Sequence, residues 1–194
     1  MSISLSLKTW FTRLSSDASW SNEALMLRYA SSGDNHALST LYDACGNDLY
    51  HFILSLSDPT LAKDISQATW LKVIEKKHLY KDSGSFKAWI FTLARNQLID
   101  EIRRQKDTTA DLGNVVAEQA DEAHDAALLS RFNRALVNLP FAQREAFCLQ
   151  QEDFSLEDIA VITHSNIEAV KSRLRYAKDG LRKQLHHIIE DEHV

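Results

Sequence analysis

The sequence predicts an all-α protein with two small helical domains joined by a flexible acidic linker, the second domain containing a helix-turn-helix. Three observations predict this class. Glycine and proline are scarce, at 5 and 2 of 194 residues, while helix-forming residues dominate. Apolar residues recur at helical spacing on both sides of the middle of the chain. Between them, residues 107–125 are polar and acidic and show no sustained helical period.

The first domain is expected over residues 22–106, after an N-terminal extension of residues 1–21 that either packs on this domain as an amphipathic helix or contacts a regulator. Apolar periodicity predicts four helices here, over residues 22–31, 34–55, 61–75 and 85–105. Ser57-Asp58-Pro59 separates the second helix from the third, and a loop at residues 80–84 precedes the fourth.

The fourth helix is the most informative element of the first domain. Its broad apolar arc predicts extensive burial, and its polar side carries Arg95, Asn96, Arg103 and Arg104. Arginine and asparagine bind phosphates and base edges, and a basic groove beside aromatic rings suits single-stranded DNA. The plainer alternative is that the aromatic side chains belong to the core and that Arg95 forms an internal salt bridge.

The second domain, expected over residues 126–188 before an acidic tail at 189–194, contains the helix-turn-helix. Two S-x-x-[DE] capping boxes, starting at Ser155 and Ser165, predict a short helix through Ile162 and a second helix after a tight turn. One face of the second helix is apolar, whereas another is basic: Lys171, Arg173, Arg175, Lys178 and Arg182. Such a basic helix suits the major groove of DNA, although a solvated basic face on an ordinary helix pair is the alternative.

The charge distribution matters more than the formal net charge of −5. Residues 63–106 carry ten Lys and Arg against five Asp and Glu, whereas residues 107–130 carry six acidic residues and no Lys or Arg. Because a ligand responds to the local potential, the basic segment favours nucleic acid despite the negative total. The acidic linker is expected to be repelled by DNA, and its length allows two modules to reach separate elements of one duplex.

Several function classes are not expected. No apolar run is long enough to span a membrane and no signal peptide is recognisable, so we expect a cytoplasmic protein in which Cys45 and Cys148 are buried free thiols. His186, His187 and His193 have no complementary ligands at metal spacing. No phosphate loop, nucleophile elbow or zinc-protease motif is present, so the sequence predicts neither an enzyme nor a cofactor.

Two blocks of the chain resemble bacterial sigma factors. The first runs from Asp64-Ile-Ser-Gln67 through Phe86-Lys-Ala-Trp89 to Arg103-Arg104, and resembles the core-binding and promoter-melting region. The second, from Ala135 through Gln143-Arg144-Glu145 to Val170-Lys171-Ser172-Arg173-Leu174, resembles the region that reads the −35 element. The compact layout resembles the extracytoplasmic-function (ECF) class. This resemblance implies an alternative sigma factor that directs core RNA polymerase to promoters and assists their opening. It also implies control by an anti-sigma factor.

The resemblance also implies which residues carry the function. The surface that docks on the coiled coil of the largest polymerase subunit would contain Asp64, Gln67 and Leu71. The residues that would contact the opened −10 element are Lys81, Ser83, Ser85, Phe86, Arg95, Asn96, Arg103 and Arg104. Contacts in the −35 major groove would come from Glu168, Lys171, Ser172, Arg173, Arg175 and Lys178.

The chain departs from the family pattern in the helix-turn-helix. The usual glycine of the turn is missing, so Asn166 or His164 is expected to adopt its unusual backbone angle. Ala169 stands where threonine is common, and Tyr176 replaces a frequent arginine. Two other classes stay open from the sequence: a dimeric helix-turn-helix regulator that acts without polymerase, and a sigma-like decoy that binds a regulator but opens no promoter.

Overall fold

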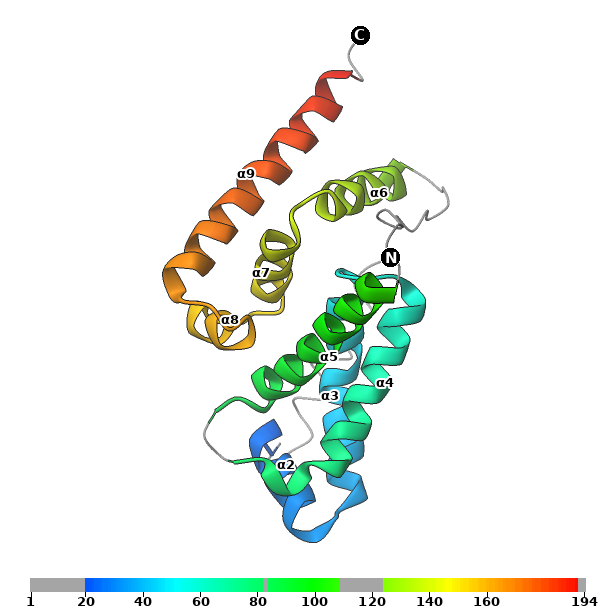
Figure 1. Ribbon diagram of the computed structural model, residues 1–194, viewed down its shortest axis with the longest axis vertical. Coiled ribbons are helices and arrows are strands. Elements are labelled where there is room, and N and C mark those ends of the chain that lie inside the picture. The colour runs from blue at the N-terminus through cyan, green and yellow to red at the C-terminus, as the bar shows by residue number, and fades with distance from the viewer. Residues whose placement is uncertain (1–19, 82–83, 109–123, 192–194) are drawn as a thin grey trace.

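The computed structural model describes residues 20–81, 84–108 and 124–191, and the regular elements within these ranges are all helical (Figure 1). This confirms the all-α class. In chain order the elements are α2 (Asn22–Ser32), α3 (Asn35–Leu54), α4 (Pro59–Glu75), the 3₁₀ helix η1 (Lys77–Leu79), α5 (Phe86–Thr108), α6 (His124–Val137), α7 (Phe141–Gln151), α8 (Leu156–Ile162) and α9 (Ile167–Asp191). We call α2–α5 the N-terminal part and α6–α9 the C-terminal part.

Side-chain caps define where the first helices begin. The Ser21 hydroxyl accepts a hydrogen bond from the backbone N–H of Ala24 at the start of α2, and Asp34 caps α3 in the same way. Asp58 caps α4, with Pro59 in its first turn, so this helix starts two residues before the sequence predicted. A proline suits this position because the first backbone N–H groups of a helix have no partner within it.

The N-terminal part is built around large apolar side chains from all four of its α-helices. Figure 1 shows α3, α4 and α5 lying alongside one another, with α2 across one end. The buried side chains that form this core include Met26, Leu41, Leu49, Phe52, Ile53, Phe86, Ile90, Phe91 and Leu98. Cys45 lies in the same core as a buried free thiol, and Cys148 is likewise free and buried in the C-terminal part.

The C-terminal part packs its helices against the apolar face of α9. Val170, Leu174, Ala177 and Leu181 are buried there, as the helical spacing of the sequence predicted. A Cβ placed on Gly180 would lie 2.9 Å from the Leu139 side chain, so glycine permits the close approach of the segment after α6 to α9.

The turn between α8 and α9 confirms one predicted cap and corrects the other. Ser155 and Asp158 form the expected capping box at the start of α8. At α9, however, the cap is Asn166, whose side chain accepts from the backbone N–H of Ala169 at 2.7 Å, because the helix begins one residue later than predicted. Ser165 instead shares a hydrogen bond with the Thr163 hydroxyl. His164, with φ of 49°, adopts the left-handed conformation expected at this turn.

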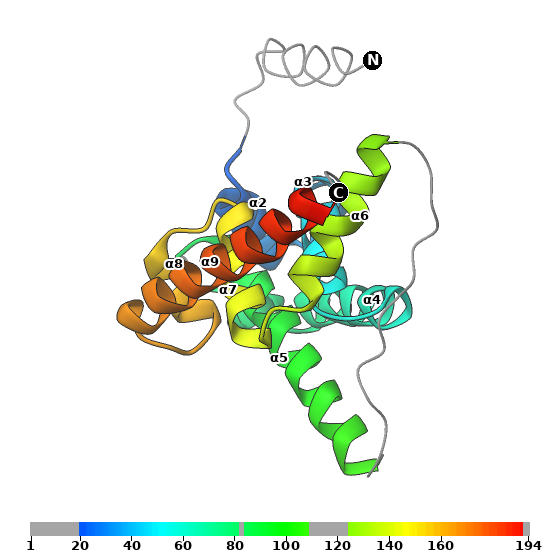
Figure 2. The ribbon, with the colours of Figure 1, turned by 90° about the horizontal axis from the view of Figure 1, so that it is seen from above.

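The two parts pack directly against each other. Helix α5 contacts α8, and the hydrophobic cluster continues without a break from the N-terminal core into residues of α7, α8 and α9. Figure 2, viewed from above, shows α7 and α8 beside the first half of α5, whose second half extends away from the C-terminal part. This contact was not predicted from the sequence, apart from the alternative that Arg95 forms an internal salt bridge, and it covers part of the face expected to bind DNA.

Some predictions concern residues that the structure does not describe. Residues 1–19 of the extension, 109–123 of the expected linker, 192–194 of the acidic tail and Ser83 lie outside the described ranges. Within the described ranges, no helix is both long enough and apolar enough to cross a membrane.

Candidate nucleic-acid interface

The first turn of α5 is fixed by the N-terminal part. The Ser85 hydroxyl accepts a hydrogen bond from the backbone N–H of Ala88 at 3.3 Å, and the Glu23 carboxylate accepts one from the backbone N–H of Phe86 at 2.9 Å. The Phe86 side chain is fully buried, with its ring 6.0 Å from that of Tyr80. In this structure Phe86 therefore belongs to the core, as the alternative interpretation of the aromatic side chains predicted. It offers DNA neither its ring nor a free backbone N–H.

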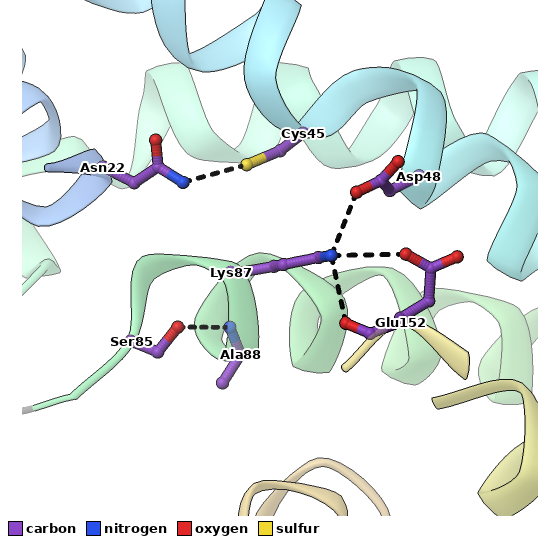
Figure 3. A network of polar contacts seen from close by, with 7 residues as sticks. All are labelled: Asn22, Cys45, Asp48, Ser85, Lys87, Ala88 and Glu152. Atoms are coloured by element: carbon purple, nitrogen blue, oxygen red, sulfur yellow. Dashed lines mark hydrogen bonds and ion pairs between the residues drawn. The ribbon is translucent and has the colours of Figure 1, made fainter. Parts of the chain in front are cut away.

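Lys87 links the N-terminal part to the C-terminal part (Figure 3). Its ammonium group donates to Asp48 on α3 at 3.0 Å, and to both the carboxylate and the backbone carbonyl of Glu152 at 3.2 Å. It also lies over the rings of Phe91 and Phe154, 5.6 and 5.5 Å from their centroids. Lys87 was not among the functional residues predicted from the sequence.

The titration of this cluster reflects one cation shared by two carboxylates. Burial by itself would lower the pKa of Lys87, but the hydrogen bonds and charges of Asp48 and Glu152 raise it above its ordinary value. Burial raises the pKa of Glu152, repulsion by Asp48 raises it further, and Lys87 only partly opposes both effects. The surroundings as a whole thus favour the charged form of Lys87 and disfavour the charged form of Glu152.

Arg95 forms the most deeply buried ion pair between the two parts. Its Nε donates to Glu145 Oε1 on α7 at 2.6 Å and its Nη2 lies 3.4 Å from Oε2, which gives a two-pronged contact. The Glu145 side chain is 1% exposed and that of Arg95 15%. Burial raises the pKa of Glu145 despite the opposing charges of Arg95, Arg173 and His164. The alternative that Arg95 forms an internal salt bridge is thus realised in this structure.

Asn96 and an aromatic pair complete the contact. The Asn96 side-chain oxygen lies 3.2 Å from Nε2 of His164, the residue at the helix-turn-helix turn, and Phe91 packs edge-on against Phe154 with ring centroids 4.9 Å apart. We define the α5 interface as these pairs together with the two ion-paired clusters: Lys87, Phe91, Arg95 and Asn96 from α5, and Glu145, Glu152, Phe154 and His164 from the C-terminal part.

The other expected −10 residues that the structure describes lie at the two ends of α5. Lys81 and Ser85 are exposed before its first turn, while Arg103 and Arg104 are exposed towards its C-terminal end. At 1.5 Å per residue, Ser85 and Arg103 are about 27 Å apart along the helix. Arg104 pairs with Glu101 at 2.6 Å on the surface. The structure therefore spreads these residues along one helix, with Arg95 and Asn96 between them in the α5 interface.

The three residues expected to bind core polymerase share one exposed face of α4. Asp64, Gln67 and Leu71 follow one another at helical spacing, and Leu71 is 60% exposed, which is unusual for a large apolar side chain. Asp64 and Gln67 border an open hollow whose other lining residues are Tyr50, Pro59, Thr60 and Lys63. The face is thus available to another protein, and it lies outside the α5 interface.

The basic face of α9 is exposed beside the turn. Lys171, Arg175 and Lys178 are exposed, whereas Ser172 and Arg173 are half-buried. Glu168 pairs with Lys171 at 2.8 Å on this surface. The neighbouring Tyr176 is 54% exposed, and the Arg175 guanidinium lies over its ring, 4.9 Å from the centroid. The helix therefore presents cations and one aromatic ring to solvent from a side that does not pack on the protein.

Comparison with known proteins identifies both parts. Residues 41–108 match the Sigma-70 region 2 family model, and residues 129–179 match that of Sigma-70, region 4. The ECF RNA polymerase sigma factor RpoE of Cereibacter sphaeroides is 30% identical over 84% of this chain and 93% of its own length. The chain belongs to the ECF family of RNA polymerase sigma factors. A further relative, SigM of Bacillus subtilis, is 28% identical over 80% of this chain and 99% of its own length.

One solved structure supports the same assignment, and a second shares the fold. The sigma factor RpoE from Bartonella quintana, determined in complex with the anti-sigma factor NepR, is 29% identical, with a TM-score of 0.68 over 76% of this chain and 96% of that one. CnrH, in complex with the cytosolic domain of CnrY, is 20% identical and shares the fold, with a TM-score of 0.65 over 86% of this chain and 98% of its own.

In this sigma factor, region 2 covers most of α3 and all of α4 and α5, whereas region 4 covers α7, α8 and much of α6 and α9. The α5 interface therefore joins region 2 to region 4. No role was predicted for Glu145 and Glu152, the acidic side of this interface. A usable signal was present, because Glu145 stands directly before the apolar run Ala146-Phe147-Cys148-Leu149, and a buried carboxylate needs a cationic partner.

Proposed function

We propose that this ECF sigma factor binds core polymerase through α4, places α9 in the major groove of the −35 element and holds the opened −10 strand along α5. The observation that carries the −35 assignment is the geometry of α8 and α9. Their apolar faces are buried, their turn is capped, and Lys171, Arg175 and Lys178 point away from the protein. Helix-turn-helix proteins bind DNA with such an exposed second helix.

The −10 assignment rests on the residue types along α5. Asn96 offers both a donor and an acceptor to a base edge, while Lys81, Arg95, Arg103 and Arg104 offer cations to the backbone. Keeping a base out of the stack costs a few kcal/mol, and a basic surface that binds the separated strand offsets that cost. Ser83 and Ser85 are assigned to the same strand, since they precede α5. The chain itself carries out no chemical step in this mechanism.

For core polymerase, we assign Asp64, Gln67 and Leu71 to the surface that docks on the coiled coil of the largest subunit. An exposed leucine flanked by a carboxylate and an amide has the composition of a small protein contact, with an apolar centre and polar margins. An anti-sigma factor is a second proposed partner, supported by the complex in which the related RpoE of Bartonella quintana binds NepR.

Reversing the charge of Asp64 is expected to weaken core binding at least tenfold. The substitution removes a carboxylate contact with the polymerase and places a cation at the same position. The measurement is the affinity of purified Asp64→Arg protein for core polymerase by fluorescence anisotropy. Asp43→Arg makes the same charge change at an exposed residue of another helix, α3. Equal affinities of the two variants would contradict the assignment of the α4 face.

A further inference from the structure

The α5 interface has a consistent charge pattern. Helix α5 supplies the cations Lys87 and Arg95, and the C-terminal part supplies the carboxylates Glu152 and Glu145 that bind them. The spacings match, since the two cations are eight residues apart on α5 and the two carboxylates are seven apart along α7 and its cap. These separations correspond to about 12 and 10.5 Å along helices that run in opposite directions.

Carboxylates and DNA phosphates make the same kinds of contact with such cations. Both are anionic acceptors, and both take two-pronged hydrogen bonds from an arginine such as Arg95. The Asn96 side chain, which could otherwise hydrogen-bond a base, is held by His164. Lys87, Arg95 and Asn96 therefore each have a polar partner from region 4 in a place where DNA is expected to bind.

We propose that region 4 is an intramolecular competitor of the −10 strand, with Glu145 and Glu152 occupying the cations of α5 in place of phosphates. In this closed state Arg95 and Asn96 cannot reach DNA, so α5 binds the strand only after region 4 has moved away. The inference rests on the proposed assignment of α5 to the −10 element. It adds that the free protein masks this surface by itself, with Lys87 as a further cation of the masked face.

The closed contact has features that allow its release. Removing charges from water offsets much of the attraction in a buried ion pair, which is why burial raises the pKa of Glu145 even with Arg95 at 2.6 Å. When region 4 moves away and takes Glu152 with it, Lys87 still has Asp48 as an ion-pair partner. Opening therefore does not leave this cation unpaired. A DNA strand or polymerase that binds regions 2 and 4 apart therefore competes with a contact of limited net strength.

The first test detects the closed state in the unmodified full-length protein. A carbodiimide joins an amine directly to a carboxylate in contact with it, and the products are identified by mass spectrometry. We expect two crosslinks from Lys87, one to Asp48 within region 2 and one to Glu152 in region 4. Adding a saturating pool of random 12-nucleotide single-stranded DNA should reduce the ratio of the Glu152 product to the Asp48 product at least fivefold. Absence of the Glu152 crosslink, or an unchanged ratio, would overturn the proposal.

The second test uses a charge reversal at the edge of the contact. Glu152→Lys places a cation beside Lys87 and should raise the affinity for the same DNA pool at least tenfold. Glu157→Lys is the matched control, because Glu157 is exposed on α8 outside the α5 interface and its reversal produces the same change of net charge. Circular dichroism checks that both variants fold. Equal affinities of the two variants would refute the masking by region 4.

These results separate the competitor from the underlying function. If wild-type protein directs transcription with core polymerase while Glu152→Lys and Glu157→Lys bind single strands equally, the competitor is wrong and the sigma function stands. If the crosslink to Glu152 forms but a saturating amount of DNA does not change its ratio to the Asp48 product, the two regions touch without competing with DNA, and the proposal fails in that form as well.

Discussion

Replacing Phe86 with alanine is expected to lower the free energy of unfolding by about 3–5 kcal/mol, the usual cost of removing a buried phenylalanine. The side chain is fully buried in the core of region 2, against the rings of Tyr80 and Trp89. Its removal takes away a large apolar contact and leaves a cavity that the neighbouring helices fill only in part. Denaturation by urea, followed by circular dichroism, measures the loss.

This experiment also decides between the two roles that the sequence left open for Phe86. A residue that contacts DNA from the surface contributes little to stability, and its replacement typically changes the free energy of unfolding by less than about 0.5 kcal/mol. Lys81→Ala provides that reference, since Lys81 is exposed just before the same helix. Equal stability of the two variants would show that the Phe86 side chain is not a core residue.

The second large effect is expected at Arg175. If the guanidinium contacts a base edge, its replacement with alanine should weaken binding to a −35 duplex by about 1–3 kcal/mol. If it contacts only phosphate, the loss of affinity should be smaller and the same for all duplex sequences. The side chain is exposed in the third turn of α9, in the half of the helix nearer the helix-turn-helix turn, where recognition helices approach bases. Fluorescence anisotropy with a promoter duplex and with a scrambled duplex separates the two outcomes.

Arg182→Ala is the matched control for Arg175. Arg182 lies on the same helix seven residues further on, is 75% exposed and pairs with Asp179, so the same charge is lost farther from the expected groove. We expect its effect on the −35 duplex to be several-fold smaller. If Arg182→Ala weakened binding as much as Arg175→Ala, only the overall charge of α9 would matter, and α9 would not act as a recognition helix.

The helices could be predicted from the sequence because their signals are local. The apolar period, the scarcity of glycine and the cap at Ser155 act within a few residues, and the structure reproduces them. The predicted cap at Ser165 failed because two neighbouring residues can both cap a helix. Asn166 caps α9 in the structure, in which His164 has the left-handed conformation and the Ser165 hydroxyl is hydrogen-bonded to Thr163.

The α5 interface could not be predicted in the same way. It joins residues about 50 to 70 positions apart, such as Arg95 with Glu145 and Asn96 with His164, and no periodicity in one chain encodes such pairs. Phe154 reaches the interface because Asp153 adopts a positive φ of 62° after α7. The residue types on α5 pointed to DNA, and the sequence could not show that the same cations are satisfied within the protein.

Run-off transcription with purified core polymerase on genomic fragments tests promoter-directed initiation by this protein. We expect discrete transcripts that require this protein and that are lost with Asn96→Ala, a variant that removes a proposed contact with an opened −10 base. Promoter sequences read from these transcripts would supply the −10 and −35 elements for the binding experiments. Tight binding to core polymerase without any specific transcript would contradict promoter-directed initiation and would favour a sigma-like decoy.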